Sequence, residues 1–242
     1  MIHFVLVEPA VPENVGAAAR ALKTMGFGEL WIVNSTVHTD KQARILAHGS
    51  GDILDNVRTF DSLAAVRAEV DLMVGTSAKP RHQREVLLTP EALKTNLADK
   101  LAGQFRIALV FGREDSGLHG PEVAQCDLLT SIPLAVTYPS LNLGQAVMLY
   151  AYALSGLNAK AQVAEDGCEG QADDHQPQSQ NENQKQGQYN ALRDKSAALA
   201  ESLGYSHDSK MLGWLHEHLP LLDARSLGFV HQLVDKIQQK LK

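Results

Sequence analysis

The sequence is poor in cysteine and aromatic residues, and it has no long hydrophobic run. Its two cysteines, Cys126 and Cys168, provide neither a disulfide framework nor a paired metal-ligand spacing. No apolar run approaches the ~20 residues of a membrane span, and the first residues lack the basic region and cleavage site of a signal peptide. These features predict a protein of the reducing cytoplasm, with no metal centre and no membrane partner.

An excess of basic side chains is also absent. The formal net charge is −6, and residues 160–188 contribute six acidic and two basic side chains to it. The acidity therefore belongs largely to one segment. This balance excludes a globally basic protein that binds polyanions non-specifically, and it leaves a specific nucleic-acid partner open.

One segment cannot contribute to a hydrophobic core. Residues 167–188 contain no Val, Ile, Leu, Phe, Trp or Tyr, and glutamine is frequent among them. Such a segment buries too little apolar area to offset the entropy that is lost on ordering. We expect an acidic, Gln-rich linker over residues 159–188. It separates a larger domain, residues 1–158, from a C-terminal extension, residues 189–242.

The larger domain alternates short apolar runs with segments of helical periodicity. Strands that are apolar on both faces and separated by helices are typical of a parallel sheet. The pattern predicts an α/β fold, with a mostly parallel sheet and helices on both faces. Strands are expected at 4–8, 30–33, 57–60, 72–76, 107–111 and 128–132, and helices at 13–25, 41–48, 62–69, 90–101 and 142–157.

Two further helical predictions concern the second half of the chain. The segment 142–157 is apolar almost all round, which predicts a buried helix, and Asn142 stands where an N-cap residue is favoured. In the extension, residues 191–203, 208–219 and 223–241 carry apolar residues at helical spacing. Three helices of this size form a marginal bundle, so we expect them to pack on another surface.

Parallel α/β sheets place their sites in the loops at the carboxyl ends of the strands. Four such loops have an unusual composition: they combine small residues with charged or polar side chains. None of them matches the glycine fingerprint of dinucleotide-binding folds or the Walker pattern, which disfavours a nucleotide-dependent oxidoreductase. The four segments are residues 8–20, 74–84, 108–118, and 132–133 with 138–147.

Together these loops resemble the SPOUT superfamily of methyltransferases, in its SpoU/TrmH branch of RNA ribose 2′-O-methyltransferases. Three motifs carry the resemblance, in order along the chain. They are Glu13-Asn14-Val15-Gly16 through Arg20, Phe111-Gly112-Arg113-Glu114 through Gly117-Leu118, and Ser140-Leu141-Asn142-Leu143 through Ala146-Val147. The runs 20–26 and 138–147 are similar to those of the TrmJ/LasT-like group, and the resemblance covers about residues 1–158.

The resemblance implies a sheet with a C-terminal trefoil knot, in which S-adenosylmethionine binds in a bent conformation. It also implies a homodimer, with each site completed near the partner chain. Backbone groups of three loops would hold the cofactor. The matching positions are Thr76, Ser77, Ala78, Gly112, Ile132, Pro139, Ser140 and Leu141.

The same resemblance assigns roles at the reacting hydroxyl. Arg20 matches the arginine that activates it; because a guanidinium stays protonated, clamping an RNA phosphate and stabilising the developing alkoxide are physically easier tasks. Asn14 and Asn142 would orient Arg20 or the ribose. Glu114 would order the motif loops, and Ser140 would shape the pocket. Contacts to RNA are expected from Lys79, Arg81, Arg84 and Arg113.

The predicted function is S-adenosylmethionine-dependent methylation of a ribose 2′-hydroxyl, with the anticodon loop of tRNA as the expected substrate. Two alternatives stay open: a non-catalytic RNA-binding protein that keeps the fold, and an rRNA 2′-O-methyltransferase. A pure binder would not need the side chains of the three motifs together, which favours the enzyme. The C-terminal extension is expected to take part in RNA recognition.

Overall fold

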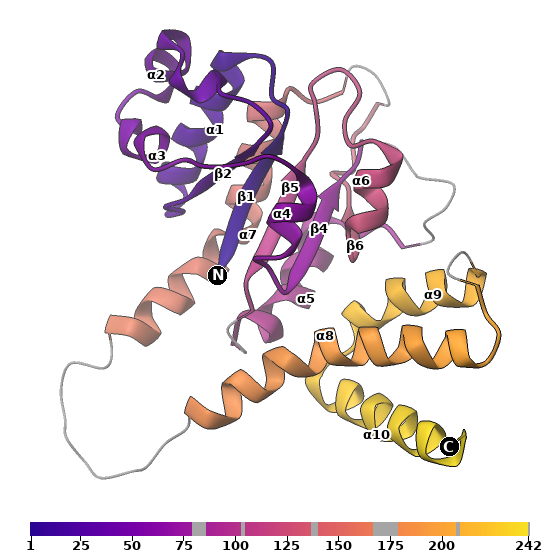
Figure 1. The fold of residues 1–242 in the computed structure, drawn as a ribbon. Coiled ribbons are helices and arrows are strands. Elements are labelled where there is room, and N and C mark those ends of the chain that lie inside the picture. The colour runs from indigo at the N-terminus through magenta and orange to yellow at the C-terminus, as the bar shows by residue number, and fades with distance from the viewer. Residues whose placement is uncertain (79–85, 103–104, 137–139, 167–178, 207–208, 242) are drawn as a thin grey trace.

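A six-stranded parallel sheet forms the centre of the larger domain (Figure 1). The computed structural model describes residues 1–78, 86–102, 105–136, 140–166, 179–206 and 209–241. Every pairing between the named strands is parallel, and the strand order is β3-β2-β1-β5-β4-β6. This confirms the predicted α/β fold. The strands are β1 Ile2–Val7, β2 Leu30–Val33, β3 Arg58–Phe60, β4 Leu72–Thr76, β5 Ile107–Phe111 and β6 Leu128–Thr130.

Helices cover both faces of this sheet, as predicted. Phe4 and Leu6 of β1 point into a core shared with one set of helices, whereas Val5 and Val7 point into a core on the opposite face. This alternation follows from the two-residue period of a strand. The first face is covered by α1 Pro12–Thr24, α2 Lys41–Ala47, α3 Gly51–Asp55, α5 Pro90–Ala102 and α7 Leu143–Asp166, and the second by α4 Leu63–Arg67 and α6 Gly120–Gln125.

The strand order changes direction between β1 and β5. The chain leaves β1 towards β2 on one side of the sheet and leaves β5 towards β6 on the other. Connections that diverge from adjacent parallel strands open a binding crevice at their carboxyl ends. The loops after β1 and β5 therefore face each other, and these are two of the loops that the sequence singled out.

Close packing of α1 explains its small residues. A Cβ at Gly16 would lie 2.1 Å from the backbone oxygen of Ala43 in α2, so only glycine allows this approach. On its other side α1 packs against α7, where Ala17 approaches Gly144. The helix that carries Asn14 and Arg20 is thus held between two others.

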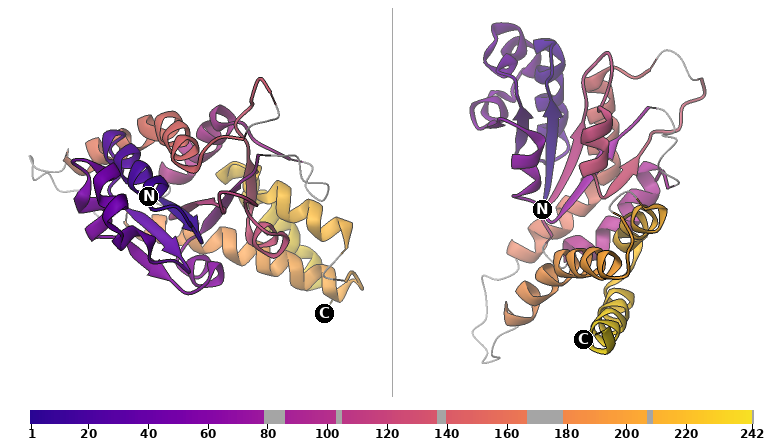
Figure 2. Two further views of the ribbon diagram at one scale, coloured as in Figure 1. Left: turned by 90° about the horizontal axis from the view of Figure 1, so that it is seen from above. Right: turned by 45° about the vertical axis from the view of Figure 1, so that its right-hand side comes forward.

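The C-terminal extension packs against the end of the sheet where the strands begin (Figures 1 and 2). Its elements are α8 Ser179–Ser202, α9 Lys210–His218, a 3-10 turn Leu219–Leu221 and α10 Ala224–Leu241. Asn96 of α5 donates from Nδ2 to the carbonyl of Pro220 at 3.3 Å. Arg193 of α8 lies 3.6 Å from the carboxylate of Asp127, which directly precedes β6. The expectation that the extension packs on another surface is confirmed, and that surface belongs to the same chain.

Several helix boundaries differ from prediction. The short helices α3 and α6 were not predicted, because five or six residues give too little periodicity to recognise. Helix α7 continues to Asp166 and α8 begins at Ser179, so helices enter the expected linker from both ends. Alanine is frequent in the first of these stretches and glutamine in the second, and both are good helix formers. Residues 167–178 lie outside the described residues, and the trefoil knot stays a prediction.

Candidate functional site

Glu114 ties the loop after β5 to the start of α1. Its carboxylate accepts hydrogen bonds from the backbone amides of Ala10 at 3.1 Å and Val11 at 3.2 Å, and from Nδ2 of Asn14 at 3.0 Å. Burial disfavours the ionised form, but these donors together outweigh it, so the pKa of Glu114 lies below its usual value. The carboxylate is therefore ionised at neutral pH and fixes the first turn of α1 in place.

Asn14 extends this network to the third motif. Its Oδ1 accepts a 2.7 Å hydrogen bond from Nδ2 of Asn142, while Oδ1 of Asn142 accepts the backbone amide of Gly144 at 2.8 Å. The second bond confirms the predicted N-cap of α7. Gln145 completes the cap, because its Oε1 accepts the backbone amide of Asn142 at 3.2 Å. Glu114, Asn14 and Asn142, which belong to three separate motifs, thus form one continuous chain of hydrogen bonds.

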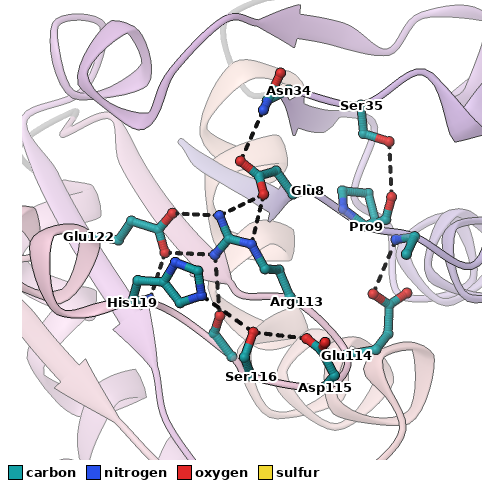
Figure 3. A network of polar contacts seen from close by, with 12 residues as sticks. Glu8, Pro9, Asn34, Ser35, Arg113, Glu114, Asp115, Ser116, His119 and Glu122 are labelled. Atoms are coloured by element: carbon teal, nitrogen blue, oxygen red, sulfur yellow. Dashed lines mark hydrogen bonds and ion pairs between the residues drawn. The ribbon is translucent and has the colours of Figure 1, made fainter.

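Arg113 lies in a different environment from that expected of an RNA phosphate contact (Figure 3). Its guanidinium donates two 3.0 Å hydrogen bonds to the carboxylate of Glu122 and one of 2.8 Å to Glu8. The side chain is only 15% exposed. A guanidinium engaged by two carboxylates has little capacity left for a phosphate, so this geometry favours a positioning role between the loop after β1 and helix α6.

Glu8 and Asn34 adopt strained backbone conformations at the ends of β1 and β2. Their φ angles are 46° and 51°, in the left-handed region that residues other than glycine seldom occupy. Asn34 donates from Nδ2 to Glu8 at 2.9 Å (Figure 3). The hydrogen bonds from Asn34 and Arg113 hold the pKa of the Glu8 carboxyl below its usual range. Strain of this kind at a strand end is characteristic of a functional site.

Sequence reasoning missed Glu8, Asn34 and Glu122 as site residues. Glu8 and Asn34 each follow a buried strand directly, which was the available signal. For Glu122 the sequence offered only a local signal, because this residue closes a capping box with His119 at the start of α6. Its pairing with Arg113 depends on the fold.

The loops expected to hold a cofactor meet at the carboxyl ends of β4, β5 and β6, which are neighbours in the sheet. Thr76 donates from Oγ1 to the carbonyl of Val110 at 3.0 Å, and the amide of Ser77 donates to the carbonyl of Thr130 at 2.9 Å. At Gly112 a Cβ would lie 2.1 Å from the carbonyl carbon of Gly117, so the turn after β5 requires glycine. The three loops are therefore held together by specific contacts.

The side chains at these positions are small or apolar and carry no charge. Ala78 and Ser140 are exposed, and Thr76, Ser77, Ile132 and Leu141 are half-buried. Leu134 and Val136 add exposed apolar surface to the loop after β6. Neutral backbone groups beside apolar side chains suit a flat heterocycle with its ribose, so the residues present fit S-adenosylmethionine. Pro139 lies outside the described residues.

Arg20 is not part of the hydrogen-bonded network. Its side chain is exposed on α1 and, within the described part of the chain, makes no hydrogen bond or ion pair. It is thus available to a ligand, in contrast to Arg113. The other expected RNA contacts, Lys79, Arg81 and Arg84, lie outside the described residues.

Among the described residues, no group of three or more His, Cys, Asp or Glu side chains is placed to hold a metal ion. In the same part of the chain, no helix has the length and apolarity needed to cross a membrane.

Comparison with known proteins matches two segments to families. Residues 1–152 match the SpoU rRNA Methylase family. Residues 186–241 match the family described as tRNA/rRNA methyltransferase LasT, C-terminal domain.

Individual relatives cover different shares of the chain. It is 42% identical over 240 residues to the uncharacterized tRNA/rRNA methyltransferase LasT of Escherichia coli, which covers 99% of this chain and 98% of that protein. It is 41% identical over 151 residues to the tRNA (cytidine/uridine-2′-O-)-methyltransferase TrmJ of Pectobacterium atrosepticum, with 62% of each protein covered. Among solved structures, a probable methylase family protein from Haemophilus influenzae has a TM-score of 0.62 at 28% identity, over 99% of this chain and 97% of that one.

Proposed function

The chain belongs to the SpoU rRNA Methylase family, and on this premise we propose that it transfers a methyl group from S-adenosylmethionine to a ribose 2′-hydroxyl of RNA, with tRNA as substrate. The observation that carries the proposal is the hydrogen-bonded chain Glu114–Asn14–Asn142. It joins all three motifs at the carboxyl ends of the strands. The similarity to a tRNA 2′-O-methyltransferase over 151 residues supports tRNA as the substrate.

The cofactor would bind at the loops after β4, β5 and β6. Backbone groups at Thr76–Ala78, Gly112, Ile132 and 139–141 would hold it, and Leu134 and Val136 would cover its apolar surface. When bound, its sulfonium supplies the methyl group and leaves as a neutral thioether. The absence of a side chain at Gly112 lets the backbone of Gly117 and Leu118 pack against this turn, which keeps the loop backbone in place.

Arg20 would act on the RNA. Its exposed guanidinium is free of carboxylate partners in the described residues, so it can pair with a phosphate next to the target ribose. A fixed positive charge there also stabilises the oxyanion that develops as the hydroxyl attacks and releases its proton to water. Asn14 and Asn142 would position the ribose, while Glu114 and Arg113 would hold the loops that carry them.

The family resemblance implies a homodimer, and the surface of α7 supports this part of the proposal. Leu149 and Tyr152 are large apolar residues on this helix, and Tyr152 is 69% exposed. Burial of such residues against a second copy would be favourable by the hydrophobic effect. Asn142 caps the N-terminus of α7, so an interface along this helix would bring the partner chain close to the site.

Transfer of labelled methyl groups to purified tRNA and rRNA tests the proposal. The product RNA is digested to nucleosides, and mass spectrometry identifies the modified species. We expect a 2′-O-methylated nucleoside from tRNA that depends on both the protein and S-adenosylmethionine. Methylation of rRNA alone would favour the rRNA enzyme. RNA binding without transfer would favour the non-catalytic alternative.

A further inference from the structure

The outer face of α9 carries an exposed aromatic residue among potentially cationic ones. Lys210, Trp214 and His218 are spaced by four residues, so they lie on one face of the helix. Trp214 is 54% exposed, whereas Leu212 on the inner face is buried. A large aromatic ring left in water at this position costs free energy, which indicates a partner that covers it.

The ring of Trp214 is held in place before any partner arrives. It stacks on the imidazole of His218, with ring centroids 4.4 Å apart and an angle of 21° between the planes. The imidazole is anchored in turn by a 2.8 Å hydrogen bond between its Nδ1 and the carbonyl of Trp214. A pre-ordered ring loses little side-chain entropy on binding, so more of the contact energy appears as affinity.

Helix α10, which follows α9 in the chain and packs on α8, carries a second pairing of an aromatic ring with a cation. The guanidinium of Arg225 lies 5.6 Å from the ring centroid of Phe229, which is 57% exposed. Single-stranded nucleic acid is bound by this combination of aromatic rings, which stack on bases, and cations, which contact the backbone. A helix-binding protein partner would favour an apolar stripe, and α10 carries one in the exposed residues Phe229, Leu233, Ile237 and Leu241. The base-stacking role is therefore confined to the face of α9.

The extension is anchored, so α9 has a defined position relative to the candidate active site. The contacts Asn96–Pro220 and Arg193–Asp127 hold it at the end of the sheet where the strands begin, whereas Glu114 and Asn142 lie at the carboxyl ends. An RNA that contacts both α9 and the candidate active site must be larger than a single loop. A folded tRNA-sized substrate satisfies this requirement.

We propose that Trp214, supported by His218, is a stacking site for an unpaired base of the RNA substrate, and that Lys210 contacts an adjacent phosphate. This rests on the proposed function in that the base belongs to the RNA that is methylated. The site binds and orients this RNA; it takes no part in methyl transfer itself.

Intrinsic fluorescence gives a direct test, because the chain has only two tryptophans. Trp31 is 2% exposed in the core, so an RNA-dependent change in emission reports on Trp214. The full-length protein is titrated with tRNA and with an unstructured 12-nucleotide RNA. We expect quenching of emission with both, abolished in Trp214→Phe, and about tenfold weaker RNA binding for Trp214→Ala. Leu203→Ala, which removes a comparably exposed side chain at the end of the extension's first helix, serves as the matched control.

Three results would overturn the proposal. The first is unchanged RNA affinity of Trp214→Ala with a native circular dichroism spectrum. The second is the absence of quenching when either RNA binds the wild-type protein. The third is a change of oligomeric state in Trp214→Ala, which would make this face an interface between copies of the chain. The short RNA tests base stacking on Trp214 without requiring methyl transfer. Failure of the proposed function would instead appear as a lack of methylation by the wild-type protein, so the two failures can be told apart.

Discussion

The side chain of Asn142 donates a 2.7 Å hydrogen bond to Oδ1 of Asn14, across 128 positions of sequence. The bond joins the residue that caps α7 to the first turn of α1. Asn142 therefore has two separable functions: its Oδ1 caps α7, and its Nδ2 connects that helix to the network of Glu114. Helix α7 is only partly buried, in contrast to the prediction, because Leu149 and Tyr152 are exposed. Variants that remove one function at a time distinguish stability from assembly of the site.

Replacement of Asn142 by alanine should lower both stability and methyl transfer. Loss of an N-cap costs about 1 kcal/mol, which lowers the melting temperature by roughly 2–4 °C in a protein of this size. Asn142→Asp keeps the cap acceptor and loses the donor to Asn14, so we expect nearly wild-type melting with reduced transfer. Calorimetry and a methyl-transfer assay measure the two effects. Equal melting temperatures for wild type and Asn142→Ala would show that the cap contributes nothing.

Arg113→Lys should reduce methyl transfer at least tenfold while RNA affinity stays the same. A lysine ammonium cannot reproduce the paired hydrogen bonds to Glu122 together with the contact to Glu8. The loop after β5 should then lose its fixed position. The check is tRNA binding across a salt series, beside the transfer assay. The slope of log affinity against log salt concentration counts phosphate contacts. If this slope is smaller by about one unit in Arg113→Lys, Arg113 contacts a phosphate and the positioning role is wrong.

Arg20→Ala should abolish methyl transfer and leave S-adenosylmethionine binding within a few-fold of wild type. The expected cofactor loops follow β4, β5 and β6, whereas Arg20 projects from α1 into solvent. Calorimetry measures cofactor binding, and labelled methyl transfer measures activity. The control is Arg44→Ala, which removes an exposed arginine on the neighbouring helix α2 that is paired with Asp55. Retained turnover in Arg20→Ala would refute the catalytic assignment.

The sheet was predictable because its strands are apolar on both faces, and the observed strands begin and end within two residues of the expected positions. The cap at Asn142 was predictable because it depends on a polar residue directly before an apolar helix. The contact between Glu114 and Asn14 was not predictable, since these residues are 100 positions apart and only the strand order brings them together. The pairing of Arg113 with two carboxylates could not be predicted for the same reason. In a sequence, an arginine at a strand end has the same appearance whether its side chain contacts RNA or two carboxylates of the same chain.

Other features leave no trace in hydrophobic periodicity. The left-handed backbone at Glu8 and Asn34 depends on how two neighbouring strands end. The start of α8 lies in a polar stretch, where helix propensity and not an apolar face decides the structure. The surface that receives the extension is formed by α5, which looked like any amphipathic helix in the sequence.

Lys100 of α5 provides a test of how the extension and the larger domain pack together. Its side chain is 8% exposed beside a cavity of about 340 Å³ that Phe105 and Leu221 also line. Within the described residues, the ammonium donates only to oxygens of Asn96, at 3.1 and 3.4 Å. Burial lowers the pKa of Lys100 to about 8, and the nearby charge of Asp99 offsets this in part. At neutral pH the folded protein therefore holds a charged group in an environment that favours the neutral form.

This arrangement predicts a pH-dependent stability. The folded pKa lies below the unfolded one, so between pH 8 and 10.5 the unfolded state binds more protons, and the free energy of unfolding rises with pH. Over this window the wild type should gain up to roughly 3 kcal/mol relative to Lys100→Met. Urea denaturation at pH 7 and pH 10.5 measures the difference, with Lys94→Met, which replaces an exposed lysine of the same helix, as control. If Lys100→Met follows the same pH dependence as the wild type, the ammonium is solvated, and the extension does not close over it as the structure requires.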